Sequence, residues 1–75
     1  MHTRTFGPAA LSVMYGAFDD AMRAVDEQTT EQNRDKVRST VGLAVVNLAM
    51  AGHSDRSHLV NYATYRARMF IDLNR

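Results

Sequence analysis

The chain contains no cysteine and only one proline, and none of its apolar stretches is long. Without cysteine, neither a disulfide framework nor a thiolate metal site can stabilise it, and redox chemistry at sulfur is excluded. The uncharged run from Ser39 to Gly52 falls short of the roughly 20 apolar residues that cross a bilayer, so we expect no membrane span. A chain of 75 residues has little stability to spare, and oligomerisation is the remaining source of it.

Motifs that carry chemistry are also missing. The sequence has no phosphate-binding glycine loop, no nucleophile elbow and no cysteine–histidine pair. Asp19 and Asp20 are adjacent and would point apart on a helix, which argues against a paired-carboxylate site. His53 and His58 are five residues apart, unlike the i, i+4 pair of a zinc helix, and surface or capping roles fit them better. We therefore expect no enzyme activity, no metal and no cofactor.

The N-terminal 20 residues have a basic start, as a secretory signal peptide would. Gly16 and the Asp19-Asp20 pair cut the apolar stretch short, however, and no small-residue cleavage pattern follows it. The expected location is therefore the cytoplasm.

Charge is distributed unevenly along the chain although the formal net charge is only +1. Residues 1–33 carry two basic and five acidic side chains, whereas residues 34–75 carry seven basic and three acidic ones. This asymmetry suits an acidic first helix that packs beside more basic ones, within one chain or across a dimer.

The segment Val37–Gly52 is apolar on two sides when it is placed on a helix. Its apolar positions do not alternate, so a strand is disfavoured despite several β-branched residues. One arc contains Val37, Val41, Ala44, Val45, Leu48 and Ala51, and the opposite arc contains Gly42, Leu43, Val46, Ala49 and Met50. A helix that is apolar all round is normally a buried one.

The fold class that follows is all-α. We predict a flexible arm at residues 1–7 and a single three-helix domain at 8–75, with helices at about 8–27, 30–51 and 55–73. Pro8 suits a first helical turn, where its missing N–H costs nothing.

The predicted helix ends rest on capping signals. Thr29 with Gln32, or Thr30 with Asn33 as a weaker version, resembles a capping box at the start of the second helix. Gly52 is a natural residue to end that helix. Ser54 or Asp55 would then cap the third helix.

The first helix has the clearest amphipathic pattern. Its predicted core arc contains Leu11, Met14, Tyr15, Phe18, Met22 and Val25. Ala10, Ala17 and Ala24 fall at heptad spacing beside this arc, so another helix can approach closely there.

The third helix carries two apolar sets with a charge between them. The first set is Leu59, Val60, Ala63, Ala67, Phe70 and Ile71, and the second is Tyr62, Tyr65, Met69 and Leu73. Arg66 lies in the middle of the combined arc. A buried guanidinium needs a partner, so we expect the Arg66 stem to pack while its head reaches solvent or pairs with a carboxylate of the first helix, with an anion contact as the alternative.

One copy of the chain offers too few surfaces to cover all of this apolar area. We therefore predict a dimeric helical bundle in which the second helix meets its symmetry mate, assisted by the outer edge of the third helix. The predicted interface comprises Gly42, Leu43, Val46, Ala49, Met50, Tyr62, Tyr65 and Met69.

The expected function is that of a small non-enzymatic protein–protein interaction or regulatory module whose partner is itself or another protein. The alternative is a nucleic-acid-binding regulator that uses Arg56, Arg66 and Arg68 of the third helix, because helices two and three superficially resemble a helix-turn-helix. His53 stands where that motif needs an inward-packing residue, and Asp55 would repel phosphates.

Overall fold

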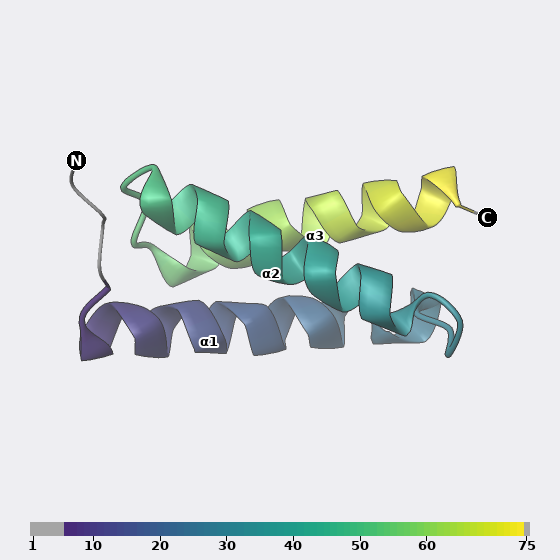
Figure 1. The fold of residues 1–75 in the computed structure, drawn as a ribbon, viewed down its shortest axis with the longest axis horizontal. Coiled ribbons are helices and arrows are strands. Elements are labelled where there is room, and N and C mark those ends of the chain that lie inside the picture. Colours follow the sequence, from purple (N-terminus) through teal and green to yellow (C-terminus); the bar gives the residue numbers. More distant parts are fainter. Residues whose placement is uncertain (1–5, 75) are drawn as a thin grey trace.

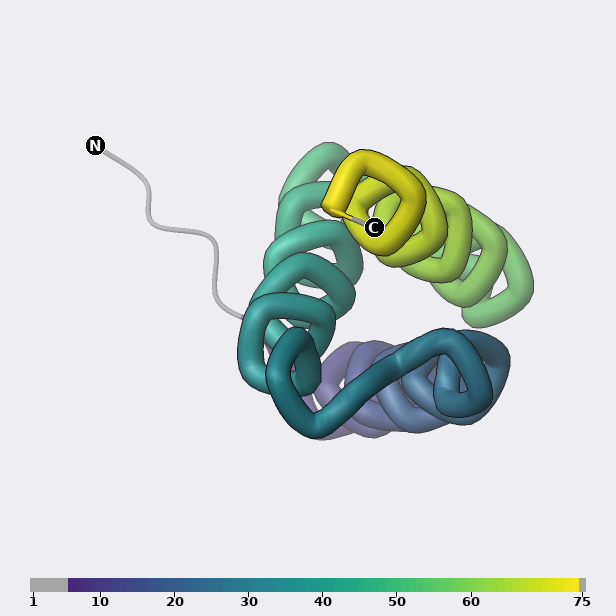
Figure 2. Tube along the Cα trace, turned by 90° about the vertical axis from the view of Figure 1, so that its right-hand side faces the viewer, coloured from purple at the N-terminus to yellow at the C-terminus, as the bar shows by residue number. Residues whose placement is uncertain are grey.

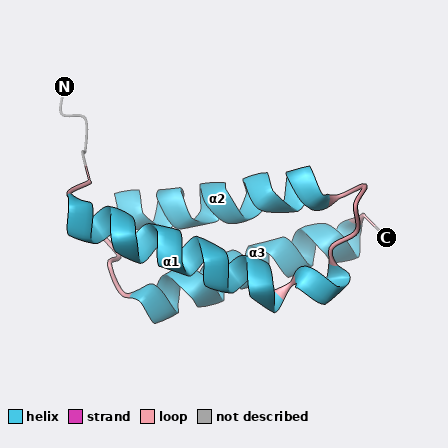
Figure 3. Cartoon of the chain, turned by 90° about the horizontal axis from the view of Figure 1, so that it is seen from below, coloured by secondary structure: helices cyan, strands magenta, loops and turns pink. Residues whose placement is uncertain are grey.

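The computed structural model describes residues 6–74, which fold into three α-helices (Figure 1). These are α1 (Pro8–Ala24), α2 (Arg34–Met50) and α3 (Arg56–Leu73), with a short 3₁₀ helix, η1 (Asp26–Gln28), after α1. The described part of the chain contains no strand, as Figure 3 also shows. The predicted all-α class with three helices is therefore confirmed.

Two helix ends differ from the prediction, each for a local reason. α1 ends at Ala24 because Val25 leaves helical geometry, with φ −110° and ψ 8°, and the chain tightens into η1. α2 begins at Arg34 because Thr30 and Asn33 close the weaker of the two expected capping boxes before it. The Thr30 N–H donates to Asn33 Oδ1 at 2.7 Å, and the Asn33 N–H donates to Thr30 Oγ1 at 3.2 Å.

The connection between α2 and α3 turns on Gly52, which has a φ of 102°. The Gly52 N–H donates to the Ala49 carbonyl at 3.0 Å, and the His53 N–H donates to the Leu48 carbonyl at 3.2 Å. This is the Schellman pattern, which satisfies carbonyls left free at a helix end. Asp55 takes the N-cap position of α3, although its side chain makes no capping hydrogen bond.

The three helices pack around one core, with α2 antiparallel to both α1 and α3 (Figures 1 and 2). The buried apolar side chains are Met14, Ala17, Ala21 and Val25 of the first segment, Val37, Val41, Ala44, Val45 and Ala49 of α2, and Leu59, Ala63, Ala67 and Ile71 of α3. Phe6 packs against this core from the predicted arm, and residues 1–5 of that arm lie outside the described residues. None of the described helices has the length and hydropathy needed to span a membrane.

The rotation of α1 about its axis differs from the predicted core arc. Ala17 and Ala21 are completely buried, whereas Tyr15 is 68% exposed. Small side chains therefore take the centre of the packed face, and the larger ones turn towards its edge. α3 differs at one position, where Thr64 is buried with no hydrogen-bond partner for Oγ1 in the described part of the chain.

Candidate functional site

An apolar groove with a volume of about 650 Å³ lies between α1 and α2. We call it the α1–α2 groove. Its apolar lining includes Phe6, Leu11, Tyr15 and Phe18 on one side and Gly42, Val45 and Val46 on the other, and its charged lining is Asp19 and Arg38.

Two of these lining side chains leave apolar surface in contact with solvent. Tyr15 is 68% exposed and Val46 is 38% exposed, and they come from opposite walls of the groove. Leu43 and Met50 of α2 are also exposed, but they do not line this groove. Exposed apolar side chains that meet across a groove mark interaction sites more often than isolated residues do.

Gly42 keeps the groove open at its middle. A Cβ atom at this position would lie 3.8 Å from Phe18 Cε2, which is ordinary van der Waals contact. Packing within the chain therefore does not require glycine there, although glycine weakens a helix interior by about 1 kcal/mol relative to alanine. The absence of a side chain at Gly42 leaves room in the groove for a side chain of a binding partner.

Arg38 borders the same groove. Its guanidinium carbon lies 5.3 Å from the centroid of the Phe18 ring, within the range of a cation–π contact. Because Asp19 stands on the opposite wall, the groove has a carboxylate on its α1 side and a guanidinium on its α2 side.

The predicted interface residues lie on α2 and α3 and differ in exposure. Leu43, Val46, Met50, Tyr65 and Met69 are exposed, and Gly42 and Tyr62 are half-buried. The structure corrects the placement of Ala49 at the interface. Ala49 lies i+4 from Val45 on the buried stripe of α2 and is only 8% exposed, so it belongs to the core of its own chain.

The exposed predicted residues also occupy different sides of α2. Gly42 and Val46 line the α1–α2 groove, whereas Leu43 lines a smaller hollow of about 160 Å³ with Tyr62 and Arg66 of α3. The larger of these two hollows therefore involves α1. Tyr65 and Met69, on the outer edge of α3 that the sequence pattern favoured, are exposed as well.

The prediction of a buried ion pair at Arg66 is wrong. Arg66 is exposed and borders α2 residues of the smaller hollow. The ion pair that joins α3 to α1 is instead formed by Arg56, whose Nε and Nη2 donate to Asp20 Oδ2 at 3.1 and 2.9 Å. At 54% and 36% side-chain exposure, this pair is a surface contact.

The arginines considered for nucleic-acid binding do not form one patch. Arg56 is turned towards α1 by its pair with Asp20, and Arg66 borders α2. Arg66 and Arg68 are two positions apart, which places them on opposite sides of a helix. No observation on the described residues favours a phosphate-binding face on α3.

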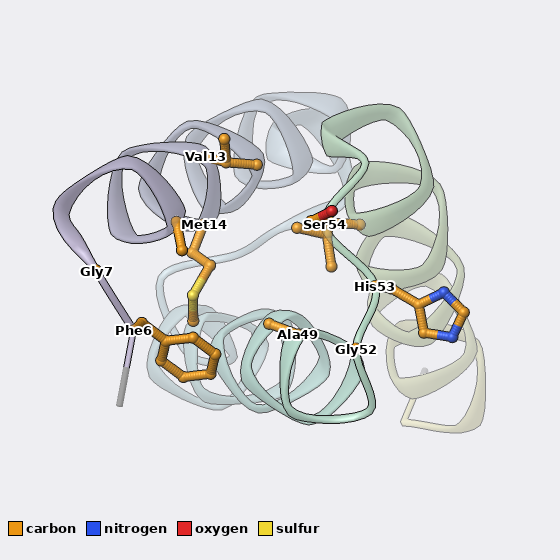
Figure 4. Close-up of a pocket in the computed structure, with 10 residues that line it drawn as sticks. Phe6, Gly7, Val13, Met14, Ala49, Gly52, His53 and Ser54 are labelled. Atoms are coloured by element: carbon orange, nitrogen blue, oxygen red, sulfur yellow. The ribbon is translucent and has the colours of Figure 1, made fainter. Parts of the chain in front are cut away.

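A second hollow, of about 220 Å³, lies at the end of the bundle near the α2–α3 connection (Figure 4). Phe6, Met14 and Ala49 face it, whereas the His53 ring points away from it. The His53 ring lies beside His58, with 4.9 Å between centroids. In the described part of the chain, no group of three or more histidine, aspartate or glutamate side chains could hold a metal ion.

Sequence reasoning assigned Tyr15 to the core because its spacing matched a core face, whereas Leu11 and Phe18 do pack against the core from its edge. One available signal was side-chain size. Ala17 and Ala21 on the adjacent stripe allow a closer helix approach, which favours burial of the alanines and leaves the larger side chains at the edge.

Comparison of the chain with protein-family models, with curated proteins and with solved structures found no match.

Proposed function

We propose that this chain is a non-enzymatic protein–protein interaction module that forms a homodimer through the α1–α2 groove. The observation that carries the proposal is the exposed apolar surface formed by Tyr15 and Val46 on the two walls of that groove. Most of the lining is aliphatic or aromatic, so it supplies buried area in a complex and few groups for proton transfer or nucleophilic attack.

The energetic argument concerns Tyr15 first. A tyrosine side chain buries about 150–250 Å² when it is fully covered, so Tyr15, which is 68% exposed, offers about 100–170 Å² to a partner. At about 25 cal/mol per Å², covering it contributes about 2.5–4 kcal/mol before losses of side-chain entropy. Aromatic residues at the centre of an interface are the ones that most often dominate binding.

Val46→Asp tests the proposal because it places a charge at the centre of the groove and leaves the core intact. We expect the wild type to have twice the 8.4 kDa chain mass at micromolar concentration, and Val46→Asp to have the single mass. The measurement is light scattering coupled to size exclusion, with circular dichroism to show that the variant remains helical.

Leu43→Asp is the matched control. It makes the same kind of change on the same helix, at an exposed position in the hollow that faces α3. We expect this variant to remain dimeric. A wild-type mass of 8.4 kDa would rule out the homodimer, and a dimer disrupted by Leu43→Asp but retained by Val46→Asp would move the interface to the α2–α3 side.

A further inference from the structure

The two walls of the α1–α2 groove carry charges of opposite sign at the same level. Asp19 lies on the α1 wall and Arg38 on the α2 wall. The adjoining hollow does not repeat this pattern, because its charged lining is Asp26 of η1 together with Arg23 of α1 and Arg34 and Arg38 of α2. The inference below therefore rests on Asp19 and Arg38 alone.

Two copies can stack face to face on this groove about a twofold axis that lies in the plane of contact. One possible axis runs perpendicular to the helices and places α1 on the partner's α1. The other axis runs parallel to the helices and places α1 on the partner's α2. These two arrangements bring different charges together.

The perpendicular axis stacks walls of like charge. The Asp19 wall of one copy then faces the acidic wall of the other, and the two Arg38 walls face each other, which is unfavourable for charges that lose solvent. Rotation about the parallel axis leaves each residue at the same position along the bundle and places the α1 wall of one copy on the α2 wall of the other. Asp19 then faces Arg38 of the partner subunit, on both sides of the apolar centre.

Helix direction does not distinguish the two axes. α1 and α2 run antiparallel within the chain (Figure 1). About either axis, each helix also runs antiparallel to the helix that it meets in the second copy, so both layouts suit opposed helix dipoles and coiled-coil-like packing. The choice of axis therefore rests on the charges.

We infer that the occupant of the α1–α2 groove is a second copy of this chain, related by a twofold axis parallel to the helices, with Asp19 paired with the partner's Arg38. This inference rests on the proposed function and adds the symmetry and the charge pairing.

The test uses two charge reversals made on separate chains, Asp19→Arg and Arg38→Asp. In each variant alone, the two symmetric contacts become like-charge pairs, and we expect dimerisation to weaken by about tenfold or more. When the two variants are mixed, both contacts become opposite-charge pairs again. We therefore expect the mixture to form a dimer of one copy of each, detected by native mass spectrometry.

Lys36→Asp is the matched control, because it reverses a charge on α2 that borders neither the groove nor the Asp26–Arg34 hollow. It should dimerise as the wild type does, and mixing should not change it. The wild type is measured first, and a monomeric wild type would overturn both the proposed function and this inference.

If the wild type is dimeric, the remaining outcomes judge the inference alone. A mixture of Asp19→Arg with wild type that forms mixed dimers in preference to either homodimer would identify the perpendicular axis, because the introduced arginine would then face the wild-type Asp19. Single variants that dimerise as well as the wild type would show that Asp19 and Arg38 do not meet across the interface. If the two variants remain helical but stay monomeric after mixing, Asp19 and Arg38 act through contacts within their own chain. Each of these results would overturn the inference and leave the homodimer standing.

Discussion

Gly16 occupies the middle of α1, where glycine is unfavourable, and the Arg56 side chain explains its presence. A Cβ atom at Gly16 would lie 2.7 Å from Arg56 Cζ, so it would clash with the guanidinium that pairs with Asp20. Gly16→Ala should gain about 1 kcal/mol of helix propensity. It should lose a similar amount because the exposed ion pair, worth up to about 1 kcal/mol, is displaced. We expect a net change in unfolding free energy close to zero, measured by urea denaturation.

The same substitution should behave differently when Arg56 is absent. In an Arg56→Ala background, Gly16→Ala has nothing to displace, and we expect it to stabilise the fold by about 1 kcal/mol. Gly42→Ala is the control, because a Cβ there makes only an ordinary contact with Phe18, so its effect should not depend on Arg56. Equal effects of Gly16→Ala in both backgrounds would show that Arg56 does not explain the glycine.

At the scale of the helices, Gly52 is the residue that ends α2. Its φ of 102° lies in a region that costs a residue with a Cβ atom about 1–2 kcal/mol. Gly52→Ala should lower the unfolding free energy by about that amount, and Gly52→Asn should cost less because asparagine tolerates this region better. Thermal denaturation of the three proteins measures the order. Equal stability of wild type and Gly52→Ala would mean that the turn reorganises without cost.

Helix ends of this kind could be predicted because their causes are local. Gly52, Pro8 and the Thr30–Asn33 pair act within a few residues of themselves, and each lies at a helix end or in the turn before one. The helix ends that differ from the prediction lie where two local hydrogen-bonding arrangements compete. Thr29 could have capped α2, but its hydroxyl donates to the Val25 carbonyl at 2.7 Å instead.

The rotation of each helix could not be predicted in the same way, because it depends on the neighbours. On α3, including Tyr65 and Met69 in the apolar arc placed the centre of that arc at Arg66. Both side chains are exposed in the structure, and the packed centre is at Ala63 and Ala67. The apolar arc alone does not distinguish a buried edge from an exposed one.

For the whole molecule, the core is made of small side chains. Six of its thirteen buried apolar residues are alanines, and Leu59 is the largest side chain that is fully buried in the described residues. Alanine buries little apolar area, so such a core gives a single copy modest stability. Larger apolar side chains such as Tyr15, Leu43 and Met50 are exposed instead. Covering part of this surface by dimerisation would therefore add a substantial fraction of the total stability.

A stability that depends on dimerisation must also depend on protein concentration. A hundredfold rise in concentration adds about 2.7 kcal/mol per mole of dimer, which corresponds to a rise of about 5–10 °C in the unfolding midpoint for a pair of this size. We expect wild type and Leu43→Asp to show this rise in scanning calorimetry. Val46→Asp should have a lower midpoint that does not change with concentration, because its unfolding involves one chain. Added salt should lower the wild-type midpoint more than the Val46→Asp midpoint, since salt screens contacts between Asp19 and the partner's Arg38 only in a dimer. A wild-type midpoint that is the same at both concentrations would contradict the proposal that this fold depends on a second copy.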